Sequence, residues 1–409
     1  MAASLQKIIS GRYAGRNVPI ALVLPDGGRL ALSAAPEVEV VARTWRGLKA
    51  LASPAMGTLA RAYVRGDIDF TGGAKRILSI AESLVGDIAH GHDTLREKYR
   101  LWKHQRRPNR ANIQHHYDVS NAFYRLWLDE RMVYSCAYFE RDDASLGDAQ
   151  LAKLDHICRK LRLEEGQRFL DIGCGWGGLI LRAAEKYGVR ATGITLSKNQ
   201  FEHVKREIAA RGLGSRVEVR LQDYLDLPDG ESYDRIASVG MFEHVGVARF
   251  PKYFGTIRRV LAPGGLVLNH GITHNTMHDA SLGSGIGDFV EEYVFPGGEL
   301  TQLHRVIEGM AAQGLEAIDA EALREHYART LWHWSDALDA HLREAREVTR
   351  ESVVRAYRLY LAGSAMCFEH GWIALYQILS TKPSGDVGQG PMRGAQSVYP
   401  FQRAYIYGS

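Results

Sequence analysis

The sequence has little of what marks several classes of protein. Its 409 residues include four cysteines, at positions 136, 158, 174 and 367, and none belongs to a C-x-x-C pair. Neither a zinc site nor a disulfide framework is therefore indicated, and we expect no metal and a reduced, cytoplasmic protein. No apolar run approaches the ~18 residues that a membrane span requires.

An excess of charge of one sign is also missing. The 51 basic and 47 acidic residues give a net charge of +4. This balance favours mild attraction to anionic surfaces and argues against a dedicated nucleic-acid binder. The first 17 residues mix basic side chains with short apolar pieces only, so we expect no secretory signal.

The length of the chain predicts two domains. Residues 1–95 are expected to form a small α/β domain, with a β-hairpin around Pro25–Gly28. Residues 96–112 read as a basic linker, 113–381 as a larger domain, and 382–409 as a flexible tail rich in Gly, Pro and Ser. A packing or dimerisation role and a lipid-handling role fit the small domain equally well.

The larger domain is organised around a glycine-rich stretch, Phe169–Gly178. An apolar strand over 168–172 is followed by closely spaced glycines and then by a helix over 179–187. Gly173 and Gly175 permit positive φ and a close approach of backbone to ligand, because neither carries a Cβ. The start of the helix offers unpaired N–H groups to a polar ligand.

Two cofactor classes use such a turn. Gly173, Gly175 and Gly178 match G-x-G-x-x-G, but a dinucleotide site also requires an acid at the end of the second strand. That strand, 189–194, ends in Thr-Leu-Ser without one. Asp171 instead gives the form D-x-G-x-G, which resembles the first motif of class I S-adenosylmethionine (AdoMet) methyltransferases. AdoMet is therefore favoured over NAD.

Strand and helix periods alternate after residue 168, which predicts a doubly wound, mostly parallel sheet. Further strands are expected over 216–221, 234–239 and 265–270, and a long helix over 353–379. Ligands of such sheets bind beyond the carboxyl ends of the strands. Five polar side chains fall at or just past such ends: Asp171, Thr195, Asp223, Glu243 and His270.

Several local motifs together resemble the cyclopropane-fatty-acid synthase family, which includes the mycolic acid cyclopropane synthases. The resemblance is strong over about 112–381 and weak over Ala62–Phe70. It rests on His116–Val119 with Asn121 and Phe123-Tyr124, then Tyr134–Ala137, Asp171–Gly178, Gly193–Ser197 and Gly240–Gly246. It implies a seven-stranded, Rossmann-like AdoMet-methyltransferase sheet preceded by a small N-terminal α/β domain.

The resemblance also implies an activity. Members transfer the methylene of AdoMet to the cis double bond of unsaturated acyl chains, here expected to belong to membrane phospholipids, and form a cyclopropane ring. A carbocation intermediate is deprotonated by bound bicarbonate. The motif matches assign the bicarbonate to Cys136, largely through its backbone, Glu243, His270 and Tyr327. Ordinary packing remains the alternative for Tyr327, and a satisfied buried pair for Glu243 and His270.

The same matches assign AdoMet to three groups of residues. The amino-acid end of the cofactor falls to Tyr134 and Ser135 with Asp171, Gly173 and Gly175. The remaining residues would surround the ribose (Thr195, Leu196 and Gln200) and the adenine (Gln222, Asp223 and Tyr224).

One position departs from the family pattern. Many relatives carry a cysteine near the active site in a Tyr-Leu-x-x-Cys setting, whereas this chain has Ser364 there and Cys367 three residues later. The departure leaves C-methylation without ring closure open as the outcome. Methylation of a soluble small molecule is a further alternative. A catalytically inactive lipid-binding protein is disfavoured by the intact glycine turn and by Glu243 and His270.

The basic stretch Arg96–Arg110 carries seven Lys and Arg side chains with Tyr99 and Trp102 between them. It fits either a solvated linker or a peripheral contact with an anionic membrane, and nucleic acid is disfavoured. The expected location is cytoplasmic, at the inner face of the membrane. The resemblance further implies a homodimer.

Overall fold

The structure, a computed structural model, describes residues 8–9, 11, 18–52, 55–85, 120–275, 286–295, 298–383 and 402–407. The chain forms two compact units, each made of discontinuous segments. The first comprises Met1–Arg100, Ala280–Pro296 and Leu331–Met366, and the second comprises Leu101–Asp279, Gly297–Thr330 and Cys367–Ser409. The domain boundaries and the homodimer inferred from sequence stay predictions.

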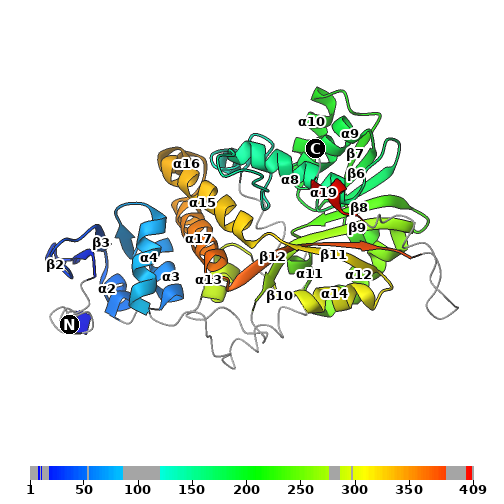
Figure 1. The fold of residues 1–409 in the computed structure, drawn as a ribbon. Coiled ribbons are helices and arrows are strands. Elements are labelled where there is room, and N and C mark those ends of the chain that lie inside the picture. The colour runs from blue at the N-terminus through cyan, green and yellow to red at the C-terminus, as the bar shows by residue number, and fades with distance from the viewer. Residues whose placement is uncertain are drawn as a thin grey trace. The chain divides into compact units, whose positions relative to one another are not determined.

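A mostly parallel sheet forms the centre of the second unit, as the sequence predicted (Figure 1). Its main path has the strand order β11-β12-β9-β8-β5-β6-β7, and the short β10 pairs with β9. The five parallel strands are β5 (Arg168–Ile172), β6 (Arg190–Thr195), β7 (Val217–Leu221), β8 (Tyr233–Val239) and β9 (Leu261–His274). The others are β10 (Thr301–Gln302, parallel to β9), β11 (Glu316–Ala322) and β12 (Ile373–Thr381), the last antiparallel to both neighbours.

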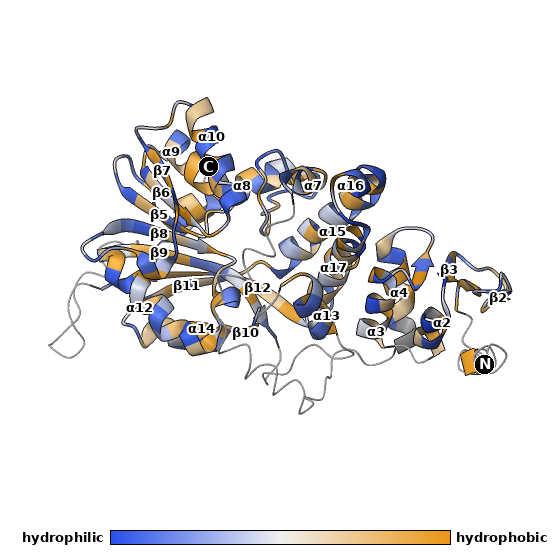
Figure 2. Ribbon diagram, turned by 180° about the vertical axis from the view of Figure 1, so that it is seen from behind, coloured by the Kyte–Doolittle hydropathy of each residue, from blue (hydrophilic) through white to orange (hydrophobic). Residues whose placement is uncertain are grey.

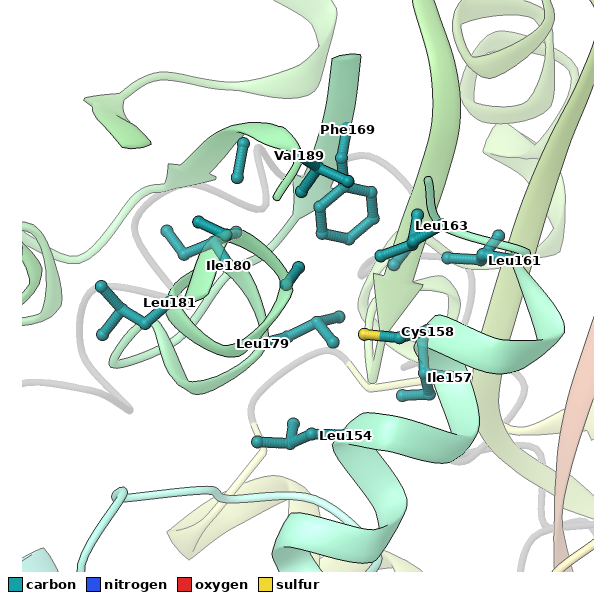
Figure 3. Close-up of a cluster of buried hydrophobic side chains, with 14 of the residues drawn as sticks. Leu154, Ile157, Cys158, Leu161, Leu163, Phe169, Leu179, Ile180, Leu181 and Val189 are labelled. Atoms are coloured by element: carbon teal, nitrogen blue, oxygen red, sulfur yellow. The ribbon is translucent and has the colours of Figure 1, made fainter. Parts of the chain in front are cut away.

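Helices cover both faces of this sheet. Successive strand residues point to opposite faces, so Phe169 packs under α8 (Leu146–Lys160), α9 (Gly178–Tyr187) and α10 (Lys198–Ala210), as Figure 3 shows for the first two. Leu170 packs on the other face, with α12 (Phe250–Val260) and α14 (Leu303–Ala311). Both helices of that face carry hydrophobic and hydrophilic residues, as Figure 2 shows.

Two expectations from the sequence, one about a helix and one about a strand, were wrong in their bounds. The helix expected over 353–379 stops early: α17 spans Glu351–Glu369, Gly371 has φ +70°, and β12 follows at Ile373. The residues of β12 pair with β9 on one side and β11 on the other, and this ladder overrides the helical pattern. The strand expected to begin at Gly265 begins at Leu261, with a register shift opposite Tyr233–Arg235.

The first unit contains a four-stranded sheet of order β2-β1-β3-β4. The predicted hairpin is confirmed, because β1 (Ile20–Val23) and β2 (Arg29–Ala31) pair antiparallel. The other elements are β3 (Val38–Ala42), β4 (Ile68–Phe70), α2 (Trp45–Ala52), α3 (Met56–Val64), α4 (Ala74–Val85), α13 (Ile286–Tyr293) and α16 (Leu342–Val348). Arg358 of α17 ties this unit together, donating to Asp339, to the Tyr63 hydroxyl at 3.0 Å and to the Gly72 carbonyl at 2.6 Å.

Short elements complete the second unit: α7 (Asn121–Arg125), α11 (Phe242–Val245), the 3-10 turns η1 (Tyr224–Asp226) and η2 (Val247–Arg249), and α19 (Ala404–Tyr407). The helix α15 (Arg324–Ala340) starts in this unit and continues into the first. Among the described residues, no helix combines the length and apolar character that crossing a membrane would take.

Candidate active site

The parallel strands bring their carboxyl ends to one edge of the sheet. The ladder aligns Ile172 of β5 with Ile194 of β6 and Ser238 of β8, and Val239 of β8 with His270 of β9. Sequence-predicted residues lie along this edge: Asp171, Thr195, Leu196, Gln222, Asp223, Tyr224, Glu243 and His270. One edge therefore gathers residues that are up to about a hundred positions apart in the chain.

The glycine turn after β5 is tight on one side and open on the other. Gly173 has φ +85° and its N–H donates to the Ile194 carbonyl at 3.0 Å. A Cβ on Gly173 would lie 2.7 Å from the sulfur of Met241. Gly175 has φ +54°, and a Cβ there would meet no atom within 4 Å. The turn is thus crowded at Gly173 and open beside Gly175.

Asp171 lies at the base of this turn and is 3% exposed. Burial raises the pKa of its carboxyl to about 7, and the Lys153 ammonium opposes that rise. Among the described residues, its Oδ1 has no hydrogen-bond partner. A buried acceptor without a partner is unfavourable, so a ligand group with an N–H donor would be stabilised here.

Tyr134 and Ser135 precede α8 in the chain. The Ser135 Oγ accepts a hydrogen bond from Lys153 Nζ at 2.7 Å, and its carbonyl accepts one from Gln150 at 2.8 Å. The Tyr134 ring lies 5.5 Å from that of Tyr124, which in turn lies 4.9 Å from that of Trp176 in the glycine turn. The turn is therefore bordered by aromatic rings.

Two of the residues that the resemblance assigns to the ribose, Thr195 and Gln200, are bonded to each other. Thr195 donates through Oγ1 to Gln200 at 2.8 Å and accepts there from the Ser197 N–H at 3.1 Å. Ser197 also caps α10 by accepting from the Gln200 N–H.

The residues that the resemblance assigns to the adenine follow directly on β7. The Gln222 N–H donates to the Thr195 carbonyl at 3.0 Å. Asp223 caps η1, where its Oδ1 accepts from the Leu225 N–H at 3.0 Å, and Tyr224 packs edge-on against Tyr253.

Glu243 and His270 are buried at the same edge. The Glu243 Oε1 accepts from the Ile272 N–H at 2.6 Å, whereas Oε2 has no partner among the described residues. Burial raises the pKa of Glu243 to about 7. Burial also lowers the pKa of His270 well below its usual value, so its imidazole is neutral. Gln377 of β12 donates its amide to His270 Nδ1 at 3.3 Å, which puts the ring proton on Nε2.

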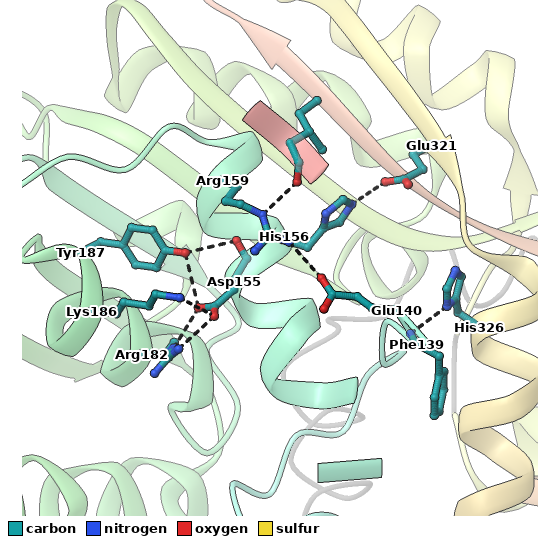
Figure 4. A network of polar contacts seen from close by, with 11 residues as sticks. Phe139, Glu140, Asp155, His156, Arg159, Arg182, Lys186, Tyr187, Glu321 and His326 are labelled. Atoms are coloured by element: carbon teal, nitrogen blue, oxygen red, sulfur yellow. Dashed lines mark hydrogen bonds and ion pairs between the residues drawn. The ribbon is translucent and has the colours of Figure 1, made fainter. Parts of the chain in front are cut away.

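Cys136 and Tyr327 are joined through the start of α15. The Cys136 Sγ lies 3.9 Å from the Leu323 carbonyl, and the Ala137 N–H donates to Thr330 Oγ1 at 3.0 Å. The Phe139 N–H donates to His326 Nδ1 at 3.0 Å, drawn in Figure 4. Tyr327, next to His326, is 7% exposed and packs on Phe368. Burial raises the pKa of the Cys136 thiol, so it is no thiolate nucleophile.

Sequence reasoning missed Lys153 and Gln377. Lys153 is 1% exposed and contacts Ser135, and Gln377 fixes the tautomer of His270. Gln150, Lys153 and Lys160 do stand at helical spacing among apolar residues of α8, which is the signal that was available. The motif His116–Val119 and the stretches Arg96–Arg110 and 276–285 lie outside the described residues.

Comparison with known proteins gives a consistent result. Residues 104–378 match the family model described as mycolic acid cyclopropane synthetase. A probable fatty acid methyltransferase of Pseudomonas putida is 42% identical over 370 residues, which cover 90% of this chain and 93% of the relative. Cyclopropane mycolic acid synthase 1 of Mycobacterium tuberculosis is 41% identical over 286 residues, 68% of this chain and 98% of the relative.

Solved structures agree with these relatives. A mycolic acid cyclopropane synthase, CmaA1, complexed with S-adenosylhomocysteine (SAH) and CTAB matches with a TM-score of 0.64 at 40% identity. The match covers 68% of this chain and 99% of that one. The likeness therefore holds for the fold as well as for the sequence. The matched enzyme was crystallised with SAH, which is what remains of AdoMet after methyl transfer.

Gly175→Val should abolish SAH binding, measured by calorimetry. Valine is strongly disfavoured at positive φ, and its side chain would occupy the space beside the turn. Gly212→Val is the matched control, because Gly212 has φ +65°, no atom within 4 Å of a Cβ, and a place in the turn after α10. It should cost about 1–2 kcal/mol of stability and leave SAH affinity unchanged. Normal SAH binding by Gly175→Val would contradict the assignment of the turn.

Glu243→Gln should stabilise the protein at neutral and higher pH. The folded state holds the pKa of Glu243 at about 7 against a usual 4.5, so ionisation destabilises it as pH rises from 4.5 to 7. The gain from removing the charge should therefore grow by about 2–3 kcal/mol between pH 5 and pH 8, as measured by urea unfolding.

Glu218→Gln is the control, because the pKa of Glu218 is shifted in the opposite direction. A hydrogen bond from Arg220 lowers the pKa of Glu218, so its charge is favourable above its usual pKa and removing it should not stabilise. A gain for Glu243→Gln that stays constant with pH would show that its carboxyl is not forced to ionise against burial.

Proposed function

Because the chain belongs to the mycolic acid cyclopropane synthetase family, we propose that it transfers the methylene of AdoMet to the cis double bond of unsaturated acyl chains in membrane phospholipids. The product is a cyclopropane ring. The observation that carries the proposal is the pairing, at one sheet edge, of an open glycine turn with two buried and partly unsatisfied groups, Glu243 and His270. The turn fits the methyl donor, and the two groups fit a proton acceptor.

AdoMet supplies an electrophilic methyl group on its sulfonium. The alkene electron pair forms a C–C bond to that methyl as the S–CH3 bond breaks, which leaves SAH and a carbocation. Loss of a proton from the new methyl group lets its C–H electron pair close the ring. An alkene is a weak nucleophile, so the chain must hold the two reactants close and in line. The turn from Asp171 to Gly178 is proposed to hold the cofactor.

Aromatic rings suit the carbocation. The rings of Tyr124, Trp127, Tyr134 and Trp176 lie within 4.9–5.5 Å of their neighbours around the glycine turn. Their faces attract cations and exclude water, and both effects prolong the life of a carbocation without supplying a nucleophile that would trap it.

Bicarbonate is proposed as the base. Glu243 Oε2 is free of partners among the described residues and fits an acceptor for the bicarbonate O–H. His270 carries its ring proton on Nε2 and fits a donor to a bicarbonate oxygen. The Tyr327 hydroxyl and the backbone at Cys136 are proposed as the remaining contacts. While the ring proton is on Nε2, that nitrogen has no free lone pair, so it does not compete with the alkene for the methyl group.

Methylation without ring closure is the second candidate. The relative covering 90% of this chain is named a probable fatty acid methyltransferase, whereas the cyclopropane synthase covers 68%. Ser364 also stands where many family members have cysteine. Both observations favour a methylated acyl chain without ring closure as the second candidate product.

Mass spectrometry of unsaturated phospholipid vesicles, incubated with protein, AdoMet and bicarbonate, tests the function. We expect a gain of one CH2 with loss of the double bond. The same gain with the double bond retained means the methylated product, and no gain contradicts both candidates. Glu243→Gln should lower turnover far more than SAH affinity, because Glu243 is proposed to act only in proton removal. An equal loss in both would refute that role.

Peripheral attachment to an anionic membrane is a further part of the proposal, and so is a place at its cytoplasmic face. It rests on the basic stretch Arg96–Arg110, which lies outside the described residues. Replacing Arg106, Arg107 and Arg110 by Gln should weaken binding to anionic vesicles and reduce its sensitivity to salt. Sedimentation with zwitterionic vesicles is the control. Unchanged binding to anionic vesicles would leave this stretch a linker.

A further inference from the structure

Two lysines of α8 are almost completely buried, and their surroundings differ. Lys160 is 0% exposed and forms an ion pair with Glu321 at 2.5 Å, with Asp319 at 3.7 Å. Lys153, two turns earlier, is 1% exposed. Within the described part of the chain, no carboxylate forms an ion pair with it. Burying an ammonium without a close counter-ion is strongly unfavourable, so the environment of Lys153 is incomplete in the protein alone.

The hydrogen bonding of Lys153 is incomplete as well. An ammonium has three N–H donors, and for Lys153 the described residues show one hydrogen bond, to Ser135 Oγ at 2.7 Å. Burial lowers the pKa of Lys153 to about 8, while its interactions with Cys136, Asp129 and Asp171 oppose that fall. The side chain is therefore still cationic at neutral pH and has donors to spare.

The nearby acids do not fill this gap. The Asp129 carboxylate accepts from the N–H groups of Val133 at 2.8 Å and Arg131 at 3.1 Å, so it is used in holding its own loop. Asp171 stands at the base of the glycine turn with Oδ1 unpartnered among the described residues. Lys153 of α8 thus has spare donors and Asp171 of β5 has a spare acceptor, and the two side chains are near enough for each to influence the pKa of the other.

We propose that Lys153 binds the α-carboxylate of AdoMet, beside Asp171, which the family resemblance already assigns to the amino-acid end of the cofactor. An amino acid carries a carboxylate and an ammonium group on one carbon, and Lys153 supplies the charge that matches the carboxylate. Lys153 also fixes the Ser135 hydroxyl, so one ammonium would anchor both the cofactor and the loop that carries Cys136. This inference rests on the proposed use of AdoMet and adds a residue to the site that the sequence motifs do not include.

Calorimetric titration with two ligands tests the carboxylate contact directly. SAH has the carboxylate, and decarboxylated SAH lacks it but keeps the amine, the ribose and the adenine. In Lys153→Met, SAH affinity should fall by about thirty-fold or more, because one partner of a buried charge pair is removed. Affinity for decarboxylated SAH should change by less than about three-fold.

Lys160→Met is the matched control, with the same substitution on the same helix. It should preserve the preference for SAH over decarboxylated SAH, even where loss of the Glu321 ion pair lowers the melting temperature. Lys153→Arg, which retains the cation, should recover part of the preference. If Lys153→Met does not fold, Lys153→Gln in the same titrations replaces it.

Three results would overturn the proposal. Equal weakening of both ligands by Lys153→Met would mean a general packing role. Unchanged affinity for both would mean no contact. If Lys153→Met keeps the preference for SAH over decarboxylated SAH but its turnover no longer responds to bicarbonate, the Lys153 ammonium serves the base instead. None of the titrations contains lipid, so they test Lys153 separately from the lipid reaction. If the lipid assay gives no product but Lys153→Met loses the preference for SAH over decarboxylated SAH, the role of Lys153 stands. If product forms but that preference does not depend on Lys153, the proposed function stands without the role of Lys153.

Discussion

The parallel ladder between β5 and its neighbours β6 and β8 is the constraint on which the rest of the site depends. It fixes the carboxyl ends of the strands at one height, so the residues that follow them need only short turns to reach a common ligand. The pairing of Ile172 with both Ile194 and Ser238 sets that height. A slip of one residue along β5 would move Asp171 from its place under the glycine turn and exchange the faces of Phe169 and Leu170. The two cores therefore hold the site in register.

This edge carries a stability penalty. Asp171, Glu243, His270, Thr273 and Gln377 each have a buried polar atom without a partner among the described residues. Such atoms are few in native proteins and call for an explanation. They lie on β5, α11, β9 and β12, while the large apolar clusters on both faces of the sheet supply the compensating stability. The stability of the sheet therefore rests on a core that does not depend on these polar groups.

The parts of the fold and the site that sequence could predict were those with a local cause. Asp171, Gly173 and Gly175 are neighbours whose spacing itself requires the turn, and the short apolar run before them predicted β5 to the residue. The helix expected over 353–379 was wrong because Ile373–Leu379 reads equally well as a buried helix or strand, and only pairing with β9 and β11 decides. Lys153 and Gln377 were missed since their burial and partners arise from segments distant in sequence.

The segment from Tyr134 to Phe139 explains how the cofactor half and the base half of such a site can act as one. On one side, Lys153 and Gln150 of α8 bind Ser135. On the other, Leu323, just before α15, contacts Cys136, and His326 and Thr330 of α15 contact Phe139 and Ala137. Tyr138 stacks between His156 of α8 at 4.2 Å and His326 of α15 at 4.7 Å. The segment is therefore bonded to α8 on one side and to the start of α15, where Tyr327 stands, on the other.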